Sequence, residues 1–425
     1  MLMRWAQPLL RRKFARRAQL EPLYGQFVEE RFGRYTQASH GHWIWIHAVS
    51  LGETRTAGIL LKGLREALPG MRLLLTHGTA TGREEGAKLL LEGDVQVWQP
   101  WDSKEAVSQF LDSFKPQIGL LMETEVWPNM VKMAQLKNIP LVLVNARMSK
   151  KSMRNALRWP ALMRPAYAGL RSALAQTQDD ANRLKQLGVQ VDGVLGNLKF
   201  DAKPDAEQVS RGHRWRDRLT EPVLMLASSR EGEEALWLNA WAAYLNQHPT
   251  VQMQWLLVPR HPQRVNEVEA LIQAQGWFVS RRSQWTAEGP LSSSAQGEKA
   301  PSIWLGDSMG EMALYYSLSQ VALLGGSFAP LGGQNLIEGI ACGCQVIMGP
   351  HTFNFTEAAH AAETEGVACR ATSMTEAIHQ AVSRLQNSQM LGLSAVQALT
   401  FVNQHAGATH RTVVAVQGYL NRSGV

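Results

Sequence analysis

Short apolar runs of strand length alternate with helix-length amphipathic segments along most of the chain. In the first half the runs lie at 43–48, 72–76, 95–98, 118–122, 140–144, 172–175 and 191–195. In the second half they lie at 223–227, 254–258, 277–280, 303–305, 321–324 and 345–348. Strands buried on both faces of a parallel sheet give continuous apolar runs, with helices in the gaps between them. The pattern therefore predicts an α/β protein made of two doubly wound domains.

The length of 425 residues exceeds what a single core of ordinary size holds, so two domains are expected. A polar stretch at 201–218 is predicted to be the linker between them. We expect an N-terminal domain over 21–205 and a C-terminal domain over 206–425, preceded by a basic segment over 1–20. The stretch 283–302 is rich in Ser, Gly and Pro and lacks periodicity, which predicts a mobile surface loop.

The segment 325–338 places glycines and small polar residues directly after an apolar strand and directly before a helix. Glycines let backbone N–H groups approach a ligand closely, and the helix start predicted near Asn335 favours an anion. A second glycine-proline loop, at 349–354, follows the next strand. Two such loops at neighbouring strand ends are typical of a nucleotide crevice. Taken alone, the segment fits an ordinary strand-to-helix junction equally well.

The net charge of +7 is concentrated near the N-terminus. Residues 1–40 carry eight basic side chains against three acidic ones, and six of the basic ones lie within residues 1–17, interleaved with apolar residues. Such a segment is a candidate to lie on an anionic membrane surface. A solvated basic helix and a nucleic-acid-binding segment are equally compatible with the pattern.

Several classes of protein are excluded by composition. With 45% hydrophobic and 19% charged residues the chain is globular. No apolar run is long enough for a membrane-spanning helix, and the N-terminus has no signal-peptide pattern. The three cysteines, Cys342, Cys344 and Cys369, are too few for a disulfide framework and are expected to be reduced thiols in a cytoplasmic protein.

Ionisable residues gather just past the predicted strand ends, where open α/β sheets bind ligands. Glu53 lies near a helix start after the first strand, Glu123 and Glu125 follow the fourth, and Lys199 follows the seventh. Glu53, and one of Glu123 and Glu125, also have a structural explanation, since a carboxylate stabilises a helix N-terminus. A P-loop, a Gly-x-Ser-x-Gly elbow and an Asp-x-Asp motif are all absent, which argues against a P-loop NTPase, an α/β-hydrolase and a metal-bound sugar diphosphate.

These residues belong to short motifs that occur from residue 30 to about residue 369. In these motifs the chain resembles the bacterial 3-deoxy-D-manno-octulosonic acid (Kdo) transferases of lipopolysaccharide synthesis. The matching words are Trp45-Ile-His-Ala-Val-Ser-Leu-Gly-Glu53, Met122-Glu-Thr-Glu-Val-Trp-Pro-Asn129, Asn145-Ala-Arg147, Gly196-Asn-Leu-Lys-Phe-Asp201, Val258-Pro-Arg-His-Pro262, Gly306-Asp-Ser-Met-Gly-Glu311, Gly325-Gly-Ser327, Gly332-Gly-Gln-Asn335 and Gly349-Pro-His-Thr-Phe-Asn-Phe355. The resemblance implies a GT-B glycosyltransferase fold, in which two Rossmann-like domains face each other across a cleft. It places the sugar nucleotide on the C-terminal domain and the acceptor on the N-terminal domain.

The resemblance also implies a reaction. Kdo moves with inversion from CMP-Kdo to the lipid A precursor lipid IVA, with Glu53 as general base and with Glu123 and Lys199 stabilising the transition state. Contacts to CMP are implied for Pro259, Arg260, Met309, Gly310, Glu311, Asn335, Leu336, Ile337 and Glu338. Neither a metal ion nor a further cofactor is expected. The implied location is the cytoplasmic face of the bacterial inner membrane, reached peripherally or through the N-terminal segment, and nucleic acid is not expected as a partner.

Two departures from the family pattern stand out. Gln334-Asn335-Leu336 occupies a place where many members have His-Asn-Pro, and the longer N-terminal apolar segment of many members is missing. Backbone donors at the helix start should survive the first change. The second leaves open whether the N-terminus inserts into the membrane or lies on it.

Two alternative functions remain at this level. Another GT-B transferase or epimerase that uses a UDP-sugar would share the fold, and a non-enzymatic basic binding protein would explain the N-terminal charge. The motifs are common to transferases that add one, two or several Kdo residues, so they leave this number open, and they do not indicate an oligomeric state.

Overall fold

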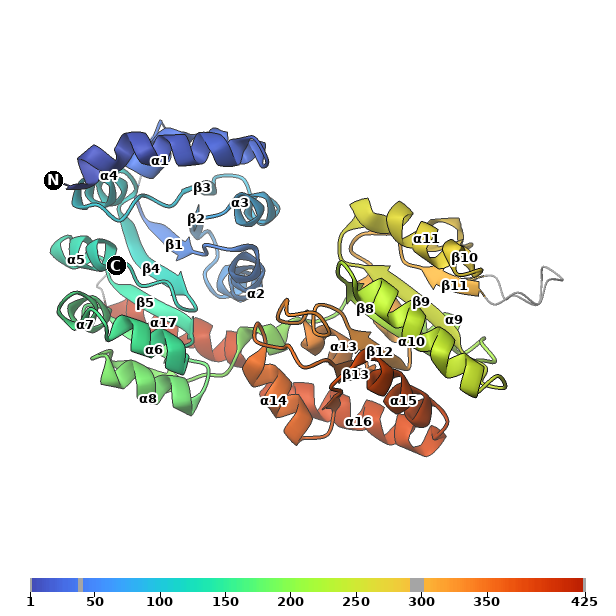
Figure 1. Cartoon of the computed structure of the whole chain (residues 1–425). Helices are drawn as coiled ribbons and strands as arrows, with labels where there is room; N and C mark the ends of the chain where they lie inside the picture. The colour runs from blue at the N-terminus through green and yellow to red at the C-terminus, as the bar shows by residue number, and fades with distance from the viewer. Residues whose placement is uncertain (1, 37–40, 291–301, 423–425) are drawn as a thin grey trace. The chain divides into compact units, whose positions relative to one another are not determined.

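The structure, a computed structural model, describes residues 2–36, 41–290 and 302–422 and divides into two compact units (Figure 1). Unit 1 comprises residues 1–201 and 405–425, and unit 2 comprises residues 202–404. Each unit contains one seven-stranded sheet in which the paired strands are all parallel. This confirms the predicted α/β class with two doubly wound sheets.

The sheet of unit 1 has the strand order β3-β2-β1-β4-β5-β6-β7. Its strands are β1 (Trp43–His47), β2 (Arg72–His77), β3 (Val95–Trp98), β4 (Pro116–Met122), β5 (Leu141–Ala146), β6 (Ser172–Ala175) and β7 (Val191–Val194). Central β1 pairs with both β2 and β4, so that Ile46 lies beside Leu75 on one side and Leu120 on the other. The chain direction across the sheet reverses between β1 and β4, which makes this the switch point where such sheets bind ligands.

The helices of unit 1 cover both faces of its sheet. They are α1 (Leu2–Ala18), α2 (Leu51–Ala67), α3 (Ala80–Ala87), α4 (Lys104–Phe114), α5 (Pro128–Leu136), α6 (Lys150–Ala156), α7 (Pro160–Ala168), α8 (Gln178–Gln186) and α17 (Ala408–Arg422), with short 3₁₀ turns η1 (Pro22–Gly25), η2 (Val28–Phe32) and η3 (Leu198–Asp201). Buried side chains of α4 to α8 pack on one face of the sheet, and those of α2 and α17 pack on the other. Alternating strand residues supply the two cores, as the two-residue period of a strand requires.

The sheet of unit 2 has the order β10-β11-β9-β8-β12-β13-β14, with its switch point between β8 and β12. Its strands are β8 (Val223–Ser229), β9 (Gln254–Pro259), β10 (Phe278–Arg281), β11 (Ser302–Leu305), β12 (Val321–Leu324), β13 (Gln345–Met348) and β14 (Ala368–Arg370). Its helices are α9 (Ala206–Arg216), α10 (Glu233–Gln247), α11 (Val265–Ala274), α12 (Met312–Leu318), α13 (Leu336–Ala341), α14 (Thr356–Thr364), α15 (Met374–Leu385) and α16 (Ser388–His405), with 3₁₀ turns η4 (Pro262–Arg264) and η5 (Arg282–Gln284). Trp237 and Trp241 pack edge-on against Trp255 in one core of this unit.

Local sequence explains where many of these helices begin. A side-chain oxygen accepts a backbone N–H of the first turn at each of eight N-caps: Ser50, Thr79, Ser103, Ser149, Thr177, Asp205, Asn335 and Ser373. Such a cap satisfies a donor that has no partner within the helix, and its loss costs about 0.5–2 kcal/mol. In the described part of the chain, no helix is both long enough and apolar enough to cross a membrane.

The domain boundaries differ from the prediction in two respects. The stretch 201–218, predicted to be a linker, contains α9, whose few apolar positions include the buried Trp215. The C-terminal helix α17, assigned from sequence to the second domain, packs in unit 1, where Val413, Val416 and Tyr419 join the core that contains α2. The basic N-terminal segment is likewise part of unit 1, because Phe14 of α1 is buried against Tyr24, Trp98 and Ala80.

All thirteen predicted strands are present, with ends within two residues of the predicted ones. The fourteenth, β14, was missed because its three residues give too short an apolar run. Of the predicted mobile loop at 283–302, residues 291–301 lie outside the described residues.

Candidate active site

In unit 1 the predicted catalytic residues lie at the carboxyl edge of the sheet, close to the switch point. Glu53 lies in the first turn of α2, which follows β1, and Glu123 directly follows β4. Lys199 lies in the 3₁₀ turn η3, which follows β7. The fold thus brings three side chains to one edge of the sheet, although the first and the last, Glu53 and Lys199, are 146 positions apart in the sequence.

The Glu53 carboxylate is held by the loop that precedes its own helix. Its Oε2 accepts the Val49 N–H at 2.7 Å and its Oε1 accepts the Ser50 hydroxyl at 3.1 Å, while Ser50 caps the helix. Burial raises the pKa of Glu53 to about 7, with the neighbouring charges of Glu125 and Glu123 adding to the shift, against the opposing effect of the two hydrogen bonds. A carboxyl that titrates near neutrality matches the requirement for a general base.

Glu123 and Lys199 form an ion pair, with Lys199 Nζ 3.0 Å from Glu123 Oε1. Glu123 has a positive φ of 56°, a left-handed conformation that is rare for a residue with a side chain. Its backbone is fixed on both sides, because its N–H donates to Val144 O and its carbonyl accepts the N–H of Arg147. Strained backbone that is held in this way is typical of functional sites.

Asn145 positions the turn that carries Lys199. The Asn145 side-chain oxygen accepts the Leu198 N–H at 3.0 Å, and its backbone carbonyl accepts the Gln176 side chain at 2.9 Å. Asn145 is buried and also has a positive φ, of 50°. Sequence reasoning noted the Asn145-Ala-Arg147 word but assigned it no role, since the contact with residue 198 depends on the neighbouring strands of the folded sheet.

Other polar groups lie at this edge, and the sequence assigned no role to them. Glu125 accepts the indole N–H of Trp127 at 2.8 Å, and burial raises its pKa above the usual value. His47 and His77 are fully buried at the ends of β1 and β2, and burial lowers their pKa values to about 3 and about 4. Both imidazoles are therefore neutral at pH 7 and add no positive charge near the Glu123–Lys199 ion pair.

In unit 2 the glycine segment after β12 has the tight backbone that the sequence predicts. Gly326, Gly332 and Gly333 have φ values of 69°, 89° and 75°, which only glycine adopts readily. A Cβ atom on Gly325 would lie 2.3 Å from the carbonyl oxygen of Ser228, so β8 and β12 approach too closely there for any side chain.

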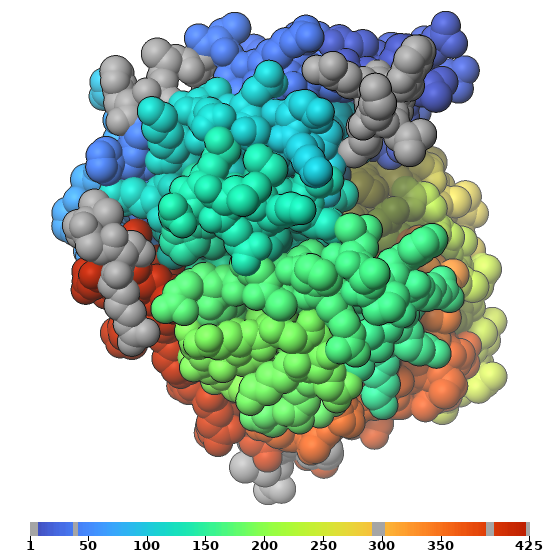
Figure 2. Space-filling view, turned by 90° about the vertical axis from the view of Figure 1, so that its left-hand side faces the viewer, coloured from blue at the N-terminus to red at the C-terminus, as the bar shows by residue number. Residues whose placement is uncertain are grey.

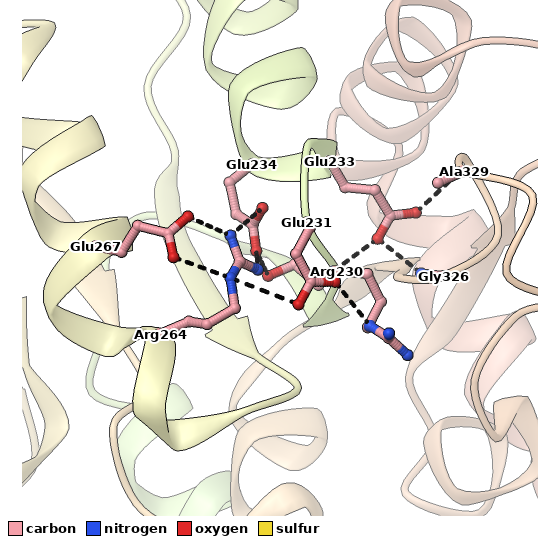
Figure 3. Close-up of polar contacts among 9 residues, drawn as sticks. Arg230, Glu231, Glu233, Glu234, Arg264, Glu267, Gly326 and Ala329 are labelled. Carbon is pink, nitrogen blue, oxygen red and sulfur yellow. Dashed lines mark hydrogen bonds and ion pairs between the residues drawn. The ribbon is translucent and has the colours of Figure 1, made fainter. Parts of the chain in front are cut away.

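A buried carboxylate occupies several of the backbone donors of this glycine loop. Glu233 begins α10 and accepts the N–H groups of Arg230, Gly326, Phe328 and Ala329 at 2.7–3.2 Å (Figure 3). Its exposed fraction is 0%. The N–H groups at the start of the glycine segment thus hold the loop to α10, and the sequence did not reveal this because Glu233 lies 93 positions before Gly326.

The adjacent Glu234 is also fully buried and anchors the loop that follows β9. It accepts a hydrogen bond from the Ser229 hydroxyl at 2.7 Å. It also accepts one from the guanidinium of Arg264 at 2.7 Å, which Figure 3 shows. Glu267 and Glu231 flank the same guanidinium. The hydrogen bonds that Arg264 donates to Glu267 and Glu234 raise its pKa above the usual value. The positive charge of Arg264 is therefore compensated by carboxylates of the protein itself.

The predicted CMP contacts lie after three strands of unit 2 that are close in the sheet. Pro259 ends β9 and Arg260 follows it, Met309 to Glu311 follow β11, and Asn335 to Glu338 form the start of α13, which comes after β12. At that helix start the N–H of Ile337 already donates to the Asn335 side chain at 3.2 Å. Met309 is 77% exposed, whereas Glu311 accepts hydrogen bonds from Arg211 at 2.8 Å and Arg282 at 3.0 Å.

Solved structures with this fold include glycosyltransferases and epimerases. MurG from Acinetobacter baumannii superposes with a TM-score of 0.55 at 14% identity, covering 89% of this chain and 99% of that one. UDP-GlcNAc 2-epimerase from Neisseria meningitidis superposes with a TM-score of 0.53 at 14% identity, covering 84% and 93%. Both likenesses concern the fold, and with the two parallel sheets they establish a GT-B architecture.

Sequence comparison is more specific than the fold. A family model described as 3-Deoxy-D-manno-octulosonic-acid transferase (kdotransferase) matches residues 26–202. The 3-deoxy-D-manno-octulosonic acid transferase of Bordetella pertussis is 43% identical over 406 residues, which is 93% of this chain and 92% of the relative. The transferase of the same name from Haemophilus influenzae is 32% identical, with 95% and 93% covered. The chain is therefore a glycosyltransferase that belongs to the family of 3-deoxy-D-manno-octulosonic acid transferases.

Proposed function

We propose that the chain transfers Kdo with inversion from CMP-Kdo to lipid IVA, the tetra-acylated glucosamine disaccharide precursor of lipid A. Family membership supports Kdo as the transferred sugar. The observation that carries the chemistry is the Glu53 carboxyl, whose burial raises its pKa to about 7 beside the switch point of unit 1. A side chain that is half ionised near neutral pH can take a proton from an acceptor hydroxyl.

In the proposed reaction the acceptor hydroxyl loses its proton to a Glu53 oxygen as it attacks the anomeric carbon of Kdo. The bond from that carbon to the CMP phosphate breaks, and the phosphate oxygen takes the bonding electrons. Attack from the face opposite the leaving group inverts the anomeric configuration. The hydrogen bonds from Val49 and Ser50 orient the carboxylate for this step.

Positive charge develops on the sugar while negative charge develops on the leaving phosphate. In the proposal Glu123 faces the first and Lys199 the second, and their 3.0 Å ion pair keeps both charges in place before substrate binds. Fixed charges that need no rearrangement during the reaction lower its barrier. The rigid backbone of Glu123 and the support that Asn145 gives to η3 preserve this arrangement.

For the donor we propose that CMP binds at the carboxyl edge of the sheet in unit 2, through Pro259, Arg260, Met309 to Glu311 and Asn335 to Glu338. Several cations gather there, among them Arg230 and Arg260, whose charges add to the effect of burial in lowering the pKa of His261. In this proposal the protein cations stabilise the leaving monophosphate without a metal ion or a further cofactor. The acceptor lipid places the enzyme on the cytoplasmic face of the inner membrane, as a peripheral protein.

The proposal is tested by incubating the purified chain with CMP-Kdo and lipid IVA. We expect release of CMP together with a lipid product that mass spectrometry shows to be heavier by one or more Kdo units. UDP-sugars should give no turnover, and transfer from CMP-Kdo should continue in excess EDTA. Release of UDP from a UDP-sugar, or a strict requirement for Mg²⁺, would contradict the proposed donor or the metal-free mechanism.

A further inference from the structure

The α6–α7 helix pair of unit 1 exposes two apolar side chains at its turn. Trp159 is the N-cap residue of α7 and is 71% exposed, and Leu162 in the first turn of the same helix is 56% exposed. The helix pair is anchored without them, because Ala156, Ala166 and Tyr167 are buried in the core of unit 1. Helices α5 to α8 lie together on one side of the sheet and form part of the surface seen in Figure 2.

The same helix pair carries a concentration of positive charge. Residues 126–178 contain nine Lys and Arg residues and no Asp or Glu. Five of these cations lie on the helix pair and its turn and are exposed: Lys150, Lys151, Arg154, Arg158 and Arg164. Within the described residues, none of the five forms an ion pair. Fold stability does not require this arrangement, since unpaired like charges on neighbouring turns repel one another.

Exposed Trp and Leu flanked by unpaired cations match the chemistry of an anionic membrane surface. A Trp ring is favourable at the level of the lipid headgroups, and each nearby Lys or Arg adds electrostatic attraction to anionic lipids. The N-terminal helix α1 differs, because its Phe14 is buried and its Arg11 pairs with Glu29. Among the aromatic side chains described on these two segments, Trp159 is exposed, whereas Phe14 and Tyr167 are buried.

The position of the helix pair relates it to the catalytic edge of unit 1. The N–H of Arg147 donates to the backbone carbonyl of Glu123 at 3.1 Å, and α6 begins three residues later. A surface that contacts lipid there brings the edge that carries Glu123 close to the headgroup layer. This relation rests on the proposed function, because it matters only for an acceptor that is a lipid.

We propose that the α6–α7 pair is the surface by which the chain docks on an anionic lipid bilayer. Trp159 and Leu162 enter the interfacial layer, and the five exposed cations face the headgroup phosphates. The carboxyl edge of the sheet in unit 1 is then presented to acceptors that are embedded in the same bilayer.

The proposal is tested by sedimentation of the full chain with vesicles of phosphatidylcholine containing 30% phosphatidylglycerol, at low salt and at high salt. We expect W159A/L162A and R154Q/R158Q each to lower the partition coefficient about tenfold or more. Matched controls are L91A/L136A, which removes two similarly exposed leucines of unit 1, and R12Q/R16Q, which removes two exposed cations of α1. Both controls should bind the vesicles as the unchanged chain does.

A second measurement separates docking from catalysis. Transfer from CMP-Kdo to a deacylated, water-soluble glucosamine disaccharide should be unchanged in W159A/L162A and R154Q/R158Q, with thermal midpoints equal to that of the parent. Parent-like vesicle binding by both helix-pair variants overturns the proposal, as does loss of binding in R12Q/R16Q alone or equal binding to pure phosphatidylcholine. Vesicle binding that depends on α6–α7 in a chain without transfer activity would support this proposal while refuting the proposed function.

Discussion

At the scale of single residues, Glu53 combines a structural and a chemical role. Its side chain bonds to Val49 and Ser50 at the start of α2, as a helix-capping carboxylate does. Those hydrogen bonds favour the ionised form, yet burial and the nearby Glu125 and Glu123 raise the pKa to about 7. Helix capping alone would leave a carboxyl with a low pKa, so the raised value points to the chemical role.

The pH dependence of transfer follows from this pKa. A general base must be ionised, so kcat/KM should fall as the pH is lowered through about 7 and level off above it. Glu53→Gln keeps the shape and one oxygen acceptor but cannot take a proton, so turnover should fall about 10²-fold or more. Steady-state kinetics from pH 5 to 9 measure both effects, and CMP binding should be little changed.

Ser50→Ala is the matched control for that substitution. It removes the N-cap of α2 and should cost about 1 kcal/mol of stability while the acidic limb of the pH profile remains. Glu53 would be a capping residue alone if Glu53→Gln and Ser50→Ala had the same small effect on turnover.

The sequence pattern predicted that Glu53, Glu123 and Lys199 lie near one another, but it did not predict their roles. Each follows an apolar strand, and parallel strands end at one edge of the sheet, so the pattern places such residues near one another. Their roles came from the resemblance to Kdo transferases. The raised pKa of Glu53 was not predictable, because it depends on Glu125 and Glu123 across the switch point, 70 or more positions away in the sequence.

At the scale of elements, the junction between α10 and the glycine loop of unit 2 changes the interpretation of that loop. The sequence predicts a loop whose backbone N–H groups are available to bind an anion. In the structure, the Glu233 carboxylate already accepts hydrogen bonds from the N–H groups of Gly326, Phe328 and Ala329. A fully buried carboxylate is stable there because four backbone donors and the start of α10 compensate its charge. The loop is therefore held in shape by the protein itself.

Glu233→Gln tests this interpretation. The amide retains one acceptor oxygen and presents an NH₂ group to backbone donors, so the unfolding free energy should fall by about 2 kcal/mol in urea titrations. Glu231→Gln, two positions away with a side chain that is 56% exposed, should change stability by less than about 1 kcal/mol. Equal losses in the two variants would show that Glu233 does not hold the loop.

The elements themselves were predictable to different degrees. Strands buried on both faces stand out as apolar runs, which is why thirteen were located from sequence. Helix α9 was mistaken for a linker because most of its eleven residues are polar, and few apolar residues, among them the buried Trp215 and the partly buried Val209, show which side faces the core. The three residues of β14 give no periodic signal at all.

At the scale of the whole molecule, the chain crosses from unit 1 to unit 2 near residue 202 and returns near residue 405. No local sequence pattern predicts that the chain re-enters unit 1 near residue 405, since α17 is amphipathic like the helices of unit 2. The tertiary contacts decide the assignment. Gln417 donates to Ala67 O at 3.1 Å and Tyr419 to Asp192 at 2.6 Å, while Val413 and Val416 are buried in the core that contains α2.

Two aspartates on either side of the first crossing should act on different units. Asp201 accepts the N–H groups of Gly407 and Thr409 and so anchors the start of α17, whereas Asp205 accepts the Gln208 N–H at 2.9 Å and caps α9. Each change to Ala should cost about 1–2 kcal/mol locally. Hydrogen exchange should accelerate in α17 and α2 for Asp201→Ala, but in α9 for Asp205→Ala. Loss of protection in α17 together with α9, and without α2, in Asp201→Ala would contradict the assignment of α17 to unit 1.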